Sequence, residues 1–160
     1  MKTLSVTVCE SSKWKSFWKW LAYADRTTTA RTHTSNDDLL SGFFPGGVGE
    51  EHRAHVTAWW VEVFGGPTTY TDELGGYEAM LAHHRGLAIT SEQRFRFASL
   101  MSLAADDAGL PSDPEFRAAL VGYLEWGTRI AQHNSQPDAD VIEHAPVPRW
   151  GWGVAPPYLP

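Results

Sequence analysis

The chain has few of the features that mark secreted, membrane-spanning or nucleic-acid-binding proteins. Its 160 residues include a single cysteine, Cys9, which excludes an internal disulfide framework and favours a reducing cytoplasm. No apolar run approaches the roughly 20 residues of a membrane-spanning helix, and we expect no secretory signal at the N-terminus. A net charge of −6 without a basic cluster argues against nucleic acid or an anionic membrane as a partner. We therefore expect one cytoplasmic domain.

Signals for β-strands are also scarce, because few segments alternate apolar and polar residues. Gly and Pro breaks instead separate segments whose apolar residues have helical spacing. The clearest is 49–64, with Val56, Trp59, Trp60, Val63 and Phe64 at i, i+3, i+4, i+7 and i+8. We expect an all-α protein with a turn at 39–44, a loop at 68–71, and helices at 13–24, 49–64, 74–84, 91–108 and beyond Pro114.

Composition divides the chain into three regions. Residues 1–36 form an N-terminal helical region that diverges from the pattern of the rest of the chain, and its Thr-rich part from Asp25 to Asn36 has almost no apolar periodicity. Residues 37–135 carry the helical pattern of a core domain. Residues 136–160 are rich in Pro and Trp, which favours an extended tail. We expect this tail to lie over the domain without forming part of its core.

Two histidines, His83 and His84, end the segment at 74–84. Neutral imidazole is a good ligand for iron, although histidine is also common as a solvated residue in a last helical turn. His52 and Val56 lie one helical turn apart and share a helix face. Apolar side chains from separate segments could join these imidazoles in one pocket; they include Phe44, Trp59, Trp60 and Phe97.

A second arrangement uses the pair His52 and His55, which are spaced i, i+3 on one helix with Glu51 adjacent. Helical bundles hold metals with such spacing, but a third and a fourth ligand are needed. The sequence shows no Glu-x-x-His on another helix. A non-haem helical metalloprotein therefore stays as the alternative.

Taken in order, these motifs resemble those of truncated haemoglobins, most closely the bacterial group II branch. Asp38 to Phe44 is similar to the family's segment ending in a corner aromatic. His52 to Phe64, followed by Gly65-Gly66-Pro67-Thr68-Thr69-Tyr70, resembles its distal helix and the Gly-Gly-Pro-x-x-Tyr end. His84 with Gly86, Leu87 and Ile89 resembles its proximal histidine, and Ser91 to His133 its last two long helices. The resemblance implies a 2-over-2 helical sandwich that binds haem.

Carried over by position, the resemblance implies that His84 ligates iron and that His83 lies near a haem propionate. Phe44 would stack on the porphyrin, while His52, Val56 and Trp60 would line the distal side. Phe97 stands where group II members usually carry a tryptophan that donates to bound ligand, and Phe lacks that donor. No tyrosine occurs between Asp25 and Asn36, so the family's distal tyrosine has no counterpart there.

These residues lead to three hypotheses about function. The first is a haem protein that binds oxygen or another diatomic gas, as a monomer or homodimer. Turnover of nitric oxide or peroxide, with a reductase partner, extends this hypothesis. The second is the non-haem metalloprotein that uses His52 and His55. The third is a globin-like domain without haem that acts as an interaction module.

Overall fold

The computed structural model describes residues 37–112 and 114–151, and over these ranges the chain is helical without a β-strand. The all-α prediction is therefore confirmed. The helix expected at 13–24 and the Thr-rich stretch lie outside the described residues. None of the described helices is long and apolar enough to cross a membrane. In order, the elements are η1 (Ser41–Phe43), α3 (Glu50–Val63), α4 (Thr69–Glu73), α5 (Gly76–His84), α6 (Ser91–Asp107) and α7 (Pro114–Asn134).

Helix α3 buries the apolar stripe that its sequence predicts, with Val63 fully buried. Its end requires glycine at Gly66, whose N–H donates to the Val61 carbonyl at 2.8 Å. A Cβ at Gly66 would lie 2.4 Å from Val61 Cγ1, so any other residue would force this turn apart. Helix α6 begins with a reciprocal capping box, in which Thr90 and Gln93 each accept the other's backbone N–H.

The prediction of a loop at 68–71 is wrong, because α4 occupies most of it. A buried carboxylate explains the helix: Glu62, which is 2% exposed, accepts the backbone N–H of Thr71 at 2.9 Å and also its hydroxyl. A side-chain acceptor at this place satisfies a first-turn N–H that has no partner within the helix. The sequence pattern marks Glu62 only as a charged residue on a helix.

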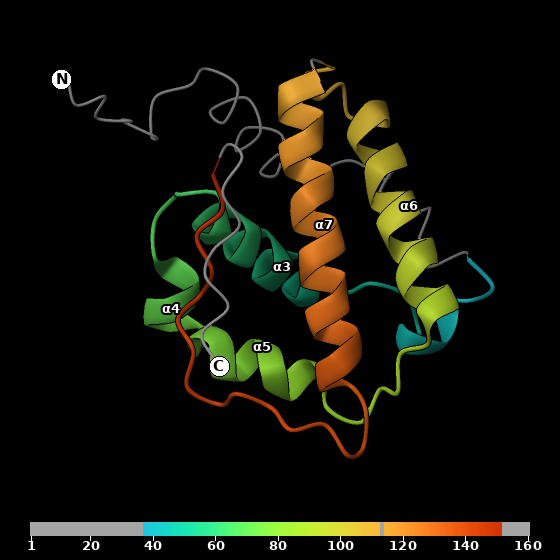
Figure 1. The fold of residues 1–160 in the computed structure, drawn as a ribbon, viewed down its shortest axis with the longest axis vertical. Coiled ribbons are helices and arrows are strands. Elements are labelled where there is room, and N and C mark those ends of the chain that lie inside the picture. The colour runs from blue at the N-terminus through green and yellow to red at the C-terminus, as the bar shows by residue number, and fades with distance from the viewer. Residues whose placement is uncertain (1–36, 113, 152–160) are drawn as a thin grey trace, which may run out of the picture.

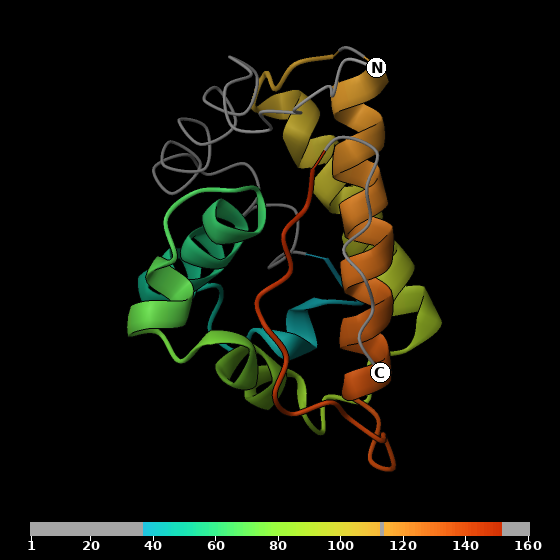
Figure 2. The ribbon, with the colours of Figure 1, turned by 60° about the vertical axis from the view of Figure 1, so that its left-hand side comes forward.

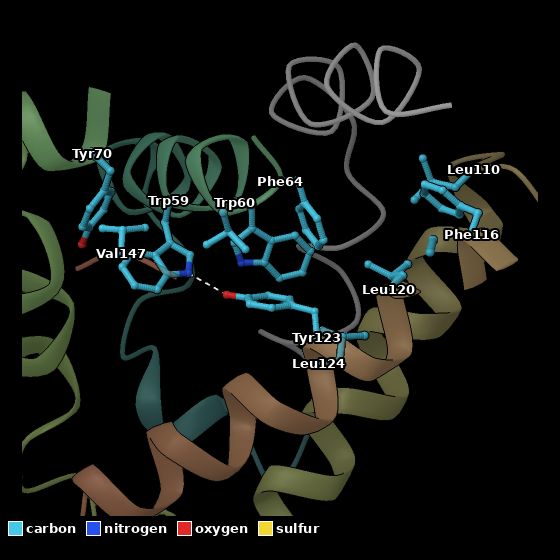
Figure 3. Packing of buried hydrophobic residues seen from close by; sticks show 12 residues of the cluster. Trp59, Trp60, Phe64, Tyr70, Leu110, Phe116, Leu120, Tyr123, Leu124 and Val147 are labelled. Atoms are coloured by element: carbon cyan, nitrogen blue, oxygen red, sulfur yellow. Dashed lines mark hydrogen bonds between the residues drawn. The ribbon is translucent and has the colours of Figure 1, made fainter. Parts of the chain in front are cut away.

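Helices α6 and α7 form an antiparallel pair, and α3, α4 and α5 lie across from α7 (Figures 1 and 2). Along the chain, α4 packs on both α3 and α5, and α5 in turn contacts α7. The buried core fills the space between α3 and α7 and continues toward α6 (Figure 3). Its largest side chains are Trp59, Trp60, Phe64, Tyr70, Phe116 and Tyr123.

The tail contributes to the core, which corrects the expectation that it only covers the domain. After α7 the chain turns back and passes between α7 and the group of α3, α4 and α5 (Figure 2). Val147 is 7% exposed and belongs to the main apolar cluster. The Trp150 backbone N–H donates to the Val63 carbonyl at 2.8 Å, and its indole Nε1–H donates to the Ala119 carbonyl at 3.0 Å. Proline content indicates extended backbone but not where its apolar side chains pack.

Candidate functional site

A cavity of about 620 Å³ lies between α3, α5, α6 and α7. This volume falls within the roughly 300–1,000 Å³ of small-molecule and cofactor sites. Most of its lining is apolar or aromatic, and a few polar groups reach it from separate helices. All seven site residues predicted from the sequence line it: Phe44, His52, Val56, Trp60, His83, His84 and Phe97. The structure thus brings them together, while their individual roles stay predictions.

His84 is the last residue of α5, and its ring is oriented by a backbone hydrogen bond. The imidazole Nδ1 lies 2.8 Å from the Met80 carbonyl oxygen. A carbonyl can only accept, so Nδ1 carries the hydrogen and Nε2 keeps its lone pair. Burial lowers the pKa of His84, and His83 lowers it further against the opposing Met80 bond. A neutral imidazole with Nε2 available is the form that binds a metal.

The loop after His84 is tied to the end of α7 by Ser135, a fully buried residue. Ala88 N–H donates to the Ser135 carbonyl at 3.0 Å, and Ile89 N–H donates to the Ser135 hydroxyl at 2.9 Å. That hydroxyl in turn donates to the Gln132 carbonyl at 2.7 Å. The loop therefore has a defined position relative to α7. Nothing in the local sequence around Ser135 indicates this contact.

On the α3 side, His52 lies at the rim of the cavity with its ring edge-on to Phe44, at a centroid distance of 5.6 Å. Burial of the imidazole lowers the pKa of His52, and the nearby His83, His55 and His84 lower it further. His55 and His83 face each other from α3 and α5, with ring centroids 6.4 Å apart. The rim thus gathers imidazoles from two helices, although the inner walls are apolar.

The deep end of the cavity holds a hydrogen bond that the sequence reasoning missed. Trp59 Nε1–H donates to the Tyr123 hydroxyl at 2.7 Å (Figure 3). Burial raises the pKa of Tyr123, and the Trp59 bond opposes this only in part. Gly127 lies one turn further along α7, where a Cβ would lie 3.5 Å from Tyr123 Cζ. Gly127, as a glycine inside an amphipathic helix, is the sequence feature that could have indicated a large aromatic ring packed beside the helix.

The alternative site, formed by His52 and His55, gains no support from the described part of the chain. In residues 37–112 and 114–151, no group of three or more His, Cys, Asp or Glu side chains is placed to hold a metal ion. Zinc and non-haem iron sites need at least three such ligands. The pair instead contributes to the cavity rim.

The sequence profile of the Bacterial-like globin family matches residues 27–126. The chain belongs to this globin family. Its fold is similar to that of the group II truncated hemoglobin from Bacillus anthracis in a crystal structure, with a TM-score of 0.64 and 22% identity. That match covers 79% of this chain and 92% of the other. No curated protein matches the sequence. The predicted truncated globin fold is therefore confirmed.

The residues of this globin fit an iron porphyrin in three respects. The cavity offers mostly apolar walls from four helices, which suits the flat ring. His84 offers a neutral Nε2 from one side. His83 at the rim offers a partner for a porphyrin carboxylate.

Proposed function

We propose that this globin binds haem through His84 and takes up a diatomic gas, with oxygen as the first candidate. The observation that supports the proposal most strongly is the orientation of His84, whose Nδ1–H is held by the Met80 carbonyl at the wall of a largely apolar cavity. When bound, haem would supply an iron that can bind a diatomic gas. Membership of the globin family also supports haem as the cofactor.

Each wall of the cavity has a distinct role in this proposal. Phe44, Val56 and Phe97 pack against the porphyrin and exclude water, which strengthens polar contacts inside the cavity. Trp60 closes the deep side. His83 at the rim pairs with a propionate. The residues named here all line the cavity.

His52 supplies the polar contact on the ligand side. A lowered pKa keeps its imidazole neutral near pH 7, so the ring has one N–H to donate and one lone pair. The N–H would donate a hydrogen bond to the gas, and the lone pair would make His52 an alternative ligand of the iron. Phe97 has no donor, and the Trp59 N–H is already engaged by Tyr123.

Turnover extends the proposal beyond gas binding. Nitric oxide dioxygenation and peroxide reduction both consume electrons, so a reductase partner belongs to that extension. The single cysteine supports a reducing, cytoplasmic setting.

The test adds haemin to the purified full-length chain and follows the Soret band of the ferric, ferrous and carbon monoxide forms. We expect stoichiometric binding and a rise in melting temperature, because a ligand that binds only the native state stabilises it. His84→Ala removes the proposed iron ligand and should abolish the carbon monoxide difference spectrum of a histidine-ligated haem. His55→Ala, at the rim on α3, is the matched control and should retain it.

Three results would contradict the proposal. A Soret band that His84→Ala leaves unchanged would assign iron binding elsewhere. Stoichiometric zinc or non-haem iron that is lost on His55→Ala would favour the metalloprotein. A melting temperature indifferent to haemin would favour a globin-like interaction domain.

A further inference from the structure

A pair of adjacent, mutually tilted indoles connects the cavity wall with the tail. Trp126, on α7, lines the cavity, and its ring centroid lies 5.9 Å from that of Trp150 in the tail. The two ring planes are tilted by 44°. Both side chains are partly exposed, so the pair reaches from the cavity to solvent.

Neighbouring groups hold this pair in place. Tyr123 packs against both indoles, with ring centroids 6.4 Å from Trp126 and 5.7 Å from Trp150. Trp150 is anchored at two points, by its backbone bond to Val63 and its indole bond to Ala119. Gly122 leaves room for it on α7, because a Cβ there would already lie 3.4 Å from Trp150 Cζ2. These contacts together hold the Trp150 side chain in a defined position in the tertiary structure.

The chemistry of these rings favours electron transfer through the indoles. Indole and phenol are the aromatic side chains that lose an electron most readily, but a phenol does so easily only when a neighbour accepts its proton. Tyr123 receives a hydrogen bond from Trp59, and no group within the described residues accepts the Tyr123 hydrogen. An indole can release an electron and keep its N–H. Electron transfer through Trp126 and Trp150 therefore costs less energy than electron transfer through Tyr123.

We propose that Trp126 and Trp150 carry oxidising equivalents from the haem cavity to the protein surface when the haem-loaded globin reacts with hydrogen peroxide. This inference rests on the proposed haem binding. Peroxide takes two electrons and two protons and leaves as two molecules of water. Trp126 supplies one of those electrons and the haem the other, and the protons come from solvent. Trp150 refills Trp126 without a bond forming or breaking in either ring. Two molecules of a one-electron donor in solution, such as a phenol or ascorbate, then return one electron to Trp150 and one to the haem.

The experiment exposes the full-length, haem-reconstituted protein to hydrogen peroxide with a nitroso spin trap and no added donor. Peptide mass mapping then locates the trapped adducts, and absorbance follows bleaching of the Soret band. We expect the adduct mainly on Trp150. Trp126→Phe should lower labelling of Trp150 several-fold, and Trp150→Phe should shift labelling to Trp126 and speed bleaching. Adding ascorbate should suppress labelling in the unmodified protein.

The matched control is Trp59→Phe, which makes the same substitution in the same cavity. Trp59 contacts Tyr123 and Tyr70, and no ring contact joins it to Trp150 within the described residues, so labelling of Trp150 should persist. Haem-free protein treated in the same way should remain unlabelled at Trp150. If Trp126→Phe does not fold, the labelling and bleaching of Trp150→Phe still decide between the outcomes.

The inference is overturned if Trp150 is labelled equally without haem, if Trp126→Phe leaves its labelling unchanged, or if adducts stay on the cavity wall. In these cases the Soret band is still present and haem binding stands. Absence of a Soret band overturns the proposed function and this inference together.

Discussion

At the scale of single residues, the buried phenol of Tyr123 shows how one group organises its surroundings. Its ring lies edge-on to Trp60 and Phe64, and its hydroxyl accepts the indole hydrogen of Trp59. A buried indole N–H needs a partner, because an unpaired donor away from water is costly. Tyr123 therefore serves the packing of α3 on α7 as well as the wall of the cavity.

We expect Tyr123→Phe to lower the free energy of unfolding by about 1–3 kcal/mol, because the buried Trp59 N–H loses its acceptor. Urea denaturation of the haem-free protein measures this. Tyr77→Phe removes a hydroxyl that accepts only a long bond of 3.4 Å from Asn134, and it should change stability less. Equal effects of the two substitutions would show that the Trp59 bond adds no stability of its own.

At the scale of elements, α4 illustrates a helix that depends on a distant side chain. It has five residues, too few to be stable alone in water. Glu62 on α3 receives two hydrogen bonds from Thr71, and Tyr70 is buried against Trp59. Contacts with α3 thus determine a structure that the local sequence does not favour.

We expect Thr71→Val to lower the free energy of unfolding by about 1–2 kcal/mol, because the buried Glu62 carboxylate loses one of its donors. Thr69→Val is the matched control on the same helix, since Thr69 is exposed. Chemical denaturation compares the two, and amide hydrogen exchange in α4 should rise in the first variant only. If amide hydrogen exchange in α4 is unchanged in the Thr71→Val variant, the stability of α4 does not depend on its hydrogen bonds to Glu62.

At the scale of the whole molecule, three carboxylates tie separate segments together. Asp37 accepts Arg96 Nε–H at 2.6 Å and so connects the chain before η1 to α6. Glu125 joins α7 to α6 through Arg94 at 2.8 Å, and Glu143 joins the tail to Arg85 at 2.6 Å. The arginine hydrogen bonds lower the pKa of all three carboxyls.

These lowered pKa values predict a loss of stability in acid. The contribution of each carboxylate is complete above its ordinary pKa, 3.8 for Asp37 and 4.5 for Glu125 and Glu143. As the pH falls through this range the unfolded chain binds protons first, and the contribution is lost as the pH reaches the folded pKa. Urea denaturation at a series of pH values should show the free energy of unfolding falling below about pH 4.5.

Asp37→Asn should reduce the slope of the free energy of unfolding against pH in this range. Added salt should also reduce this slope, because Glu125 and Glu143 are exposed. The matched control is Asp38→Asn, which removes the charge of a neighbouring exposed carboxylate. A Lys substitution would be unsuitable because it adds a charge. A slope that is the same in Asp37→Asn and in the unmodified protein would remove Asp37 from this account.

The periodicity of the chain predicted most of the fold. Spacing of apolar residues located α3 and α6 to within a residue or two. The failures came where structure depends on distant residues. Helix α4 was missed because its acceptor lies on α3, and Val147 was missed because extended backbone carries no periodic signal of burial.

The sequence by itself determined the helical pattern, because this follows from local spacing and residue type. The resemblance of its ordered motifs to a known family indicated the family and the candidate ligand His84. Only the tertiary structure decided which side chains meet. It placed seven predicted residues around one cavity, joined Trp59 to Tyr123, and tied the loop after His84 to Ser135. It also placed the ring of Trp150 against that of Trp126. Such contacts join residues far apart along the chain, and only the packing of the helices brings them within reach.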